Sequence, residues 1–149
     1  SETYEARRFR DTALTGTQAS YDAIFGQNIS LPLSTRLLVA VYVSGLSNAE
    51  ELTDHYVEEA EKALVPLNWV SAVLKDDLSD IHDSVIQAIL LFTRTLTLNP
   101  LDGDQQALLD LQSAGVSTQD CIALAQLIAF LSYQIRLVTG LKAMQALEV

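Results

Sequence analysis

Cysteine is almost absent from this chain, because Cys121 is the sole cysteine among 149 residues. One cysteine permits neither an internal disulfide nor a cysteine-rich zinc site, and it supplies no redox pair within the chain. Glycine and proline are also scarce, at 6 and 3 residues, whereas 49% of the residues are hydrophobic. This composition excludes disordered, collagen-like and linker-rich proteins and predicts a chain that folds around a core.

Basic residues and long apolar runs are also few. Lys and Arg number 9 against 19 Asp and Glu, a net charge of −10, so the average field repels phosphate backbones and anionic lipid. The longest uncharged apolar run, residues 121–135, is shorter than the roughly 20 residues that span a bilayer. No apolar segment follows the basic N-terminal residues as in a secretory signal. We expect a cytoplasmic protein with no nucleic-acid or membrane partner.

Strand patterns are nearly missing, because the apolar residues recur three and four positions apart. We predict an all-α bundle of six or seven helices, two of them buried. No linker divides the chain, so one domain over residues 1–149 is expected, with residues 1–30 as an N-terminal extension and first helix. The expected helices are 17–25, 34–45, 47–64, 67–74, 81–98, 105–111 and 121–141. The nearly all-apolar second helix is placed in the core.

Short motifs predict where several of these helices begin and end. Residues 47–50, Ser-Asn-Ala-Glu, have the Ser-x-x-Glu pattern of a capping box, and residues 117–120 resemble it with Asp in the last position. Pro66 suits the start of a helix, because a first turn needs no N–H at that position. Gly26 and Gly115 are placed to close the helices before them.

The third predicted helix carries the candidate catalytic residues. Glu51 and His55 are four positions apart and share a helix face, where a carboxylate can orient an imidazole for general-base catalysis. A purely structural helix with a partly buried His55 and solvated carboxylates explains the same spacing. The paired Glu-x-x-His motifs of a di-iron bundle are absent, and His82 beside Asp80 is explained by a solvated ion pair. We therefore predict no metal and no cofactor.

Cys121 lies in the first turn of the last predicted helix, where the helix dipole can lower a thiol pKa. Since no second cysteine can resolve an oxidised form, we expect a buried thiol that packs as a small apolar side chain. The sequence also has no Gly-rich phosphate loop, no Gly-x-Ser-x-Gly elbow and no His-Glu-x-x-His motif. Nucleotide-binding, serine-hydrolase and zinc-protease functions are therefore unsupported.

Two neighbouring stretches carry a family resemblance. Residues 33–41, Leu-Ser-Thr-Arg-Leu-Leu-Val-Ala-Val, precede residues 50–56, Glu-Glu-Leu-Thr-Asp-His-Tyr. This arrangement resembles the core of the carboxymuconolactone decarboxylase and alkylhydroperoxidase D superfamily, called AhpD-like below. Residues 91–97 and 108–137 are similar to the closing segment of its peroxidase-related branch. The resemblance covers most of residues 31–141 and implies an AhpD-like helical bundle that assembles as a homo-oligomer.

The peroxidase branch implies a Cys-x-x-Cys pair, in which one thiolate attacks peroxide, the second cysteine resolves it, and glutamate and histidine relay protons. The two cysteine positions fall on Ala49 and Leu52 with Tyr56 at the histidine position, or on Asn48 and Glu51 when His55 is aligned. Neither alignment supplies a cysteine, and Leu37 replaces the glutamate that usually follows the arginine. We therefore predict a degenerate member with a structural or ligand-binding role.

The decarboxylase branch supports an alternative, because it lacks the cysteine pair and has a Glu-Leu-x-x-His motif similar to residues 51–55. In this interpretation His55 transfers the proton in an acid/base reaction of the decarboxylase or lactone type, and Glu51 sets its tautomer. The candidate site residues are therefore His55, Glu51 and Tyr56. The expected partners are further copies of the chain and a small-molecule ligand.

Overall fold

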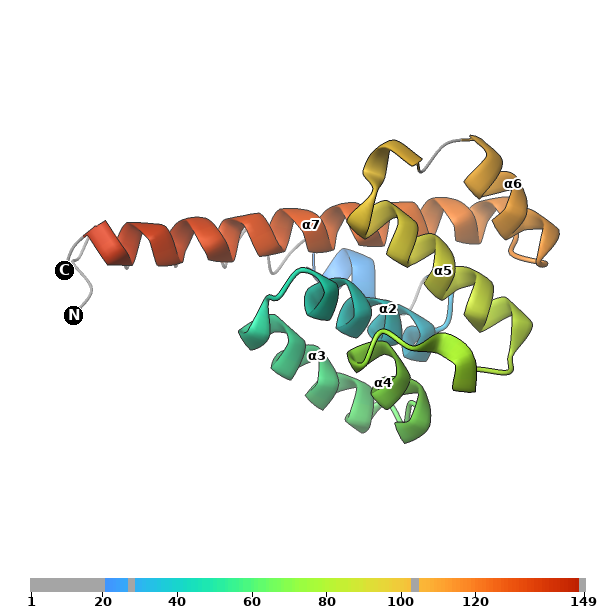
Figure 1. Ribbon diagram of the computed structural model, residues 1–149, viewed down its shortest axis with the longest axis horizontal. Coiled ribbons are helices and arrows are strands. Elements are labelled where there is room, and N and C mark those ends of the chain that lie inside the picture. Colours follow the sequence, from blue (N-terminus) through green and yellow to red (C-terminus); the bar gives the residue numbers. More distant parts are fainter. Residues whose placement is uncertain (1–20, 27–28, 103–104, 148–149) are drawn as a thin grey trace.

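The computed structural model describes residues 21–26, 29–102 and 105–147, and its regular elements in these ranges are all helical (Figure 1). After a helical segment at 21–25 come α2 (Leu33–Leu46), α3 (Glu50–Lys62), α4 (Leu67–Leu74), η1 (Leu78–Asp80), α5 (Ser84–Leu98), η2 (Pro100–Asp102), α6 (Gln105–Ser113) and α7 (Thr118–Leu147). The predicted all-α fold is confirmed. Residues 17–20 of the first predicted helix lie outside the described residues.

Helix α2 forms the centre of the core, as predicted from its apolar sequence. Its residues from Thr35 to Ser44 are all buried, and α3, α4, α5 and α7 all contact it. The buried Arg36 guanidinium donates hydrogen bonds to the backbone carbonyls of Leu31 at 2.8 Å, Ile24 at 2.8 Å and Gly26 at 3.0 Å. Burial lowers the pKa of Arg36, and these carbonyls offset the cost of burying its charge. The arginine thereby ties the segment at 21–26 to the core.

Helix α7 is longer than the predicted 121–141 and extends past the other helices (Figure 1). Its buried residues lie between Cys121 and Gln134, and from Ile135 onward its residues are half-buried or exposed. Among the described residues it is the one helix long and apolar enough to cross a membrane, with 39% of its most apolar window buried in the protein. The uncharged run of residues 121–135 is too short to span a bilayer, whereas the whole of α7 is long enough.

The predicted capping box at residues 47–50 is wrong. Ser47 closes α2, Asn48 follows with a φ of 57°, and α3 begins at Glu50 with no side-chain cap. The N–H groups of Asn48 and Ala49 instead bond the carbonyls of Gly45 and Ser44 at 3.1 and 2.9 Å. These two N–H groups give hydrogen-bond partners to carbonyls at the end of α2, which have none within the helix. The segment therefore closes α2 and does not cap α3.

Other predicted boundaries differ in accuracy. Helix α4 has the predicted bounds, and the Ser117 side chain accepts the N–H of Asp120 at 3.1 Å, which confirms the cap before α7. Helix α5 ends as predicted but begins at Ser84 and not at residue 81. The reason is that the Asp83 carboxylate caps it, accepting two backbone N–H groups at 3.0 Å. The buried apolar side chains of all these elements form one cluster.

Candidate functional site

Tyr56, on α3, is fully buried, at 0% exposure. Its hydroxyl donates to Oε1 of Gln134 on α7 at 2.6 Å. Burial raises the pKa of Tyr56 well above the ordinary tyrosine value of about 10. The phenol therefore stays protonated at neutral pH and joins α3 to α7, a geometry that suits a structural contact better than proton transfer.

His55 lies at the exposed edge of an aromatic cluster made with Tyr21, Phe25 and Tyr56. Its ring centroid is 4.9 Å from that of Tyr56, and its Nε2 is 3.3 Å from the hydroxyl of Tyr21. Burial raises the pKa of Tyr21, and the nearby Glu59 and Asp22 carboxylates raise it further. Because Tyr21 stays protonated, its hydroxyl can donate to the neutral imidazole.

Glu51 has a different partner from His55. Its carboxylate pairs with Nζ of Lys142 on α7 at 3.4 Å, and both side chains are largely exposed. The structure therefore brings His55 and Tyr56 together and directs Glu51 toward α7. Neither contact is the Glu51–His55 pairing on which the acid/base alternative depends.

Potential metal ligands do not gather in the described part of the chain, where no group of three or more His, Cys, Asp or Glu side chains could hold an ion. His82 is exposed in the turn before α5, and the adjacent Asp83 carboxylate caps that helix. Asp83 therefore has a structural role as the cap of α5.

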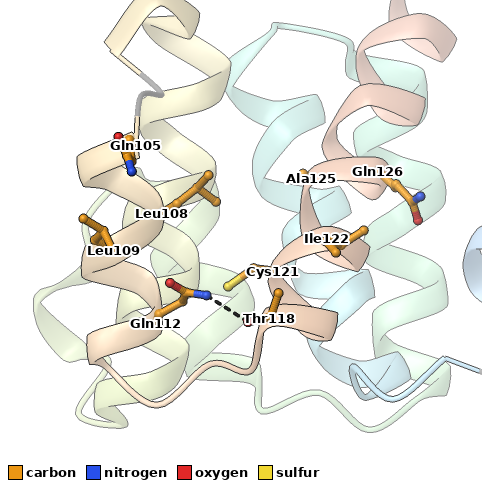
Figure 2. A pocket seen from close by; sticks show the side chains of 9 residues that line it. All are labelled: Gln105, Leu108, Leu109, Gln112, Thr118, Cys121, Ile122, Ala125 and Gln126. Carbon is orange, nitrogen blue, oxygen red and sulfur yellow. Dashed lines mark hydrogen bonds between the residues drawn. The ribbon is translucent and has the colours of Figure 1, made fainter.

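A groove between α6 and α7 is the second candidate site, with a cavity volume of about 390 Å³ (Figure 2). It is lined by Gln105, Leu108, Leu109, Gln112, Thr118, Cys121, Ile122, Ala125 and Gln126. Sequence reasoning missed this site, because a short helix with few charges looks the same whether its apolar side chains pack in a core or face a cavity. The signal available was the set of glutamines that flank the apolar residues.

Cys121 is a residue of α7 that lines this groove, and its sulfur is directed toward α6 (Figure 2). It is 3% exposed, which confirms the predicted burial, and its Sγ lies 3.8 Å from the carbonyl oxygen of Val116. Burial raises the pKa of the Cys121 thiol, and the neighbouring Asp120 raises it further. The helix start therefore does not activate this thiol, and little thiolate is present at neutral pH.

This arrangement of helices occurs in a known protein. An uncharacterized peroxidase-related protein from Silicibacter sp. TM1040 matches with a TM-score of 0.79 and 16% sequence identity, over 87% of this chain and 68% of that one. At this identity the likeness shows the fold alone. No protein-family model matches the chain, and no curated protein matches it.

Proposed function

We propose that this chain is an AhpD-like protein that has kept the fold of the superfamily without its dithiol peroxidase chemistry, and that it serves as a ligand-binding or structural protein. One observation carries the proposal. The fold resembles that of an uncharacterized peroxidase-related protein, yet the sole cysteine, Cys121, lies buried at the start of α7. The two cysteine positions that the family resemblance implies fall on Ala49 and Leu52, or on Asn48 and Glu51, at the start of α3.

The chemistry of peroxide reduction explains why the cysteine position matters. A thiolate attacks one peroxide oxygen and the O–O bond breaks, which gives a sulfenic acid and releases water or an alcohol. A second thiol then displaces water to form a disulfide, which an external dithiol reduces. Cys121 has a raised pKa and no second cysteine in the chain, so neither the attack nor the resolving step is supported.

Peroxide consumption in the presence of a dithiol reductant tests the proposal. We expect the wild-type protein and its C121A and H55A variants to consume peroxide no faster than the reductant alone. The H55A variant controls for a proton relay that does not use the thiol. Wild-type turnover that disappears in C121A would show a one-cysteine peroxidase and overturn the proposal.

The proposal includes self-association through α7. One stripe along the end of α7 has residues at alternating spacings of four and three, the spacing of a coiled-coil seam. Its residues are Tyr133, Leu137, Gly140, Met144 and Leu147. Tyr133 is 51% exposed and Leu147 is 88% exposed. A second copy of the chain is the partner that we propose for this stripe, because burying exposed apolar side chains between copies is favourable.

A further inference from the structure

The groove between α6 and α7 has the size and the walls of a small-molecule site. Its volume of about 390 Å³ lies within the range of roughly 300–1,000 Å³ that is usual for ligand pockets. Leu108 and Leu109 line it from α6 and Ile122 lines it from α7, and Leu108 points toward α7 (Figure 2). These three side chains are 40%, 46% and 55% exposed, so a bound molecule would remove apolar surface of all three from water.

The lining of the groove carries no formal charge. Its polar members are three glutamines and Thr118, although the whole chain has a net charge of −10. An ionised ligand would lose its hydration without gaining a charged partner in the groove. A neutral ligand avoids this cost, because it has no charge to desolvate. The amides of Gln105 and Gln112 on α6 offer both donors and acceptors for a polar group, whereas the Gln126 amide points away from α6 (Figure 2). Gln112 Nε2 donates to Thr118 Oγ1 at 3.0 Å, a bond that connects the two helices (Figure 2).

We infer that the groove between α6 and α7 binds a neutral, largely apolar small molecule, with its one or few polar groups directed to the glutamine side chains. This inference gives a site and a ligand class to the ligand-binding role proposed above. It does not depend on the loss of peroxidase chemistry, because binding and peroxide turnover are measured separately.

Two fluorescent probes with the same aromatic skeleton test the inference. N-phenyl-1-naphthylamine is neutral, and 8-anilinonaphthalene-1-sulfonate adds a sulfonate to that skeleton. We expect saturable fluorescence enhancement with the neutral probe and at least about tenfold weaker binding of the sulfonate, because the groove offers it no cation. Equal affinities for the two probes would contradict the neutral-ligand assignment.

A matched pair of substitutions locates the binding. Leu109 in the groove is 46% exposed and Leu74 on α4 is 48% exposed, so L109Q and L74Q make the same change at similarly exposed positions. We expect L109Q to weaken binding of the neutral probe about tenfold and L74Q to leave it unchanged. I122Q is a second groove variant, whose residue is 55% exposed, and thermal unfolding confirms that each variant folds.

Three outcomes would overturn the inference. Equal weakening of probe binding by L109Q and L74Q, or no weakening by either variant, would place the probe on exposed apolar surface elsewhere. A change of sedimentation coefficient in L109Q that is absent from L74Q would show that copies of the chain cover the groove. Retained peroxide inactivity in each case would leave the proposed loss of peroxidase chemistry unaffected.

Discussion

Asp76 joins three helices through one carboxylate. It follows α4 with a φ of 54°, and its Oδ1 accepts a hydrogen bond at 2.5 Å from the hydroxyl of Tyr42, which is fully buried on α2. Arg94 of α5 donates from Nε to Oδ1 at 3.0 Å and from Nη2 to Oδ2 at 3.1 Å. The hydrogen bonds from Arg94 and Tyr42 hold the pKa of Asp76 below its usual range.

This lowered pKa predicts a pH-dependent contribution to stability. The ionised Asp76 stabilises the fold above the unfolded carboxyl pKa of about 4, and the contribution is lost as the pH falls through the lower folded pKa. We expect D76N to be less stable than wild type at pH 7 and the difference to shrink below about pH 4. Urea unfolding across this pH range measures it.

The Y42F variant is the control for that experiment. It removes the phenol hydrogen bond and keeps the charge of Asp76 and its pairing with Arg94. We expect it to lower the free energy of unfolding by about 1 kcal/mol at neutral pH. A wild-type advantage over D76N that stays constant from pH 7 to pH 3 would show that the charge of Asp76 does not contribute.

The sequence did not predict which side chains the candidate site residues contact. Helical spacing correctly places Glu51 and His55 on one helix. Their contacts come from Lys142 and Tyr21, and Tyr56 bonds Gln134, 78 positions away. Such partners depend on how α3 packs against α7 and residues 21–25, which no local pattern encodes.

At the scale of the helix, four C-termini share one hydrogen-bond pattern. Each has a residue with positive φ after the helix, and the N–H groups of that residue and the next bond carbonyls of the last turn, as in a Schellman motif. The residues with positive φ are Asn48, Leu64, Asp76 and Gly115. A glycine-based search for helix ends therefore succeeded at Gly115, which closes α6 as predicted, although the helix ends at Ser113 and not at residue 111.

The same pattern explains the boundaries that were predicted less well. Asn48 closes α2 in the left-handed region, so a segment that looks like the start of α3 belongs to the preceding helix end. Leu64 follows α3 in the same way, which ends that helix at Lys62 and not near residue 64. Helix existence was predictable from apolar periodicity, whereas non-glycine ends depend on a conformation that the residue type disfavours.

Leu64 gives a prediction at this scale. It has a φ of 60° and is 87% exposed, so it carries backbone strain and buries little surface. We expect L64G to raise the free energy of unfolding by about 0.5–1 kcal/mol, because glycine adopts this conformation without a Cβ penalty. Urea unfolding measures the change, with L64A as the control that keeps the Cβ. An equal gain in L64A would show that the backbone conformation is not the cause.

For the whole molecule, the fold and its chemistry follow different constraints. The arrangement of helices matches that of a peroxidase-related protein at 16% identity, because a helical bundle needs apolar side chains at core positions and tolerates their exchange. A dithiol site needs two cysteines at fixed positions, and this chain has one cysteine. The fold class was therefore predictable from the sequence pattern, whereas the groove between α6 and α7 was not.

The extended α7 leads to the prediction on assembly. If copies pair along the stripe from Tyr133 to Leu147, a glutamate at its end would bring a carboxylate into an apolar contact, which is unfavourable. We expect the wild type to sediment as an oligomer at micromolar concentration and L147E to shift toward the monomer. L101E is the matched control, because Leu101 in η2 is 97% exposed and Leu147 88%.

Both leucines are so exposed that neither substitution should unfold the chain, so a difference between the variants reports on contacts between copies. M144E, at a residue that is 36% exposed in the same stripe, should act in the same direction as L147E. A monomeric wild type would remove the proposed assembly, and an equal shift in L101E would move the contact away from α7. Because none of these residues lines the groove between α6 and α7, binding of the neutral probe should persist in L147E, which separates assembly from ligand binding.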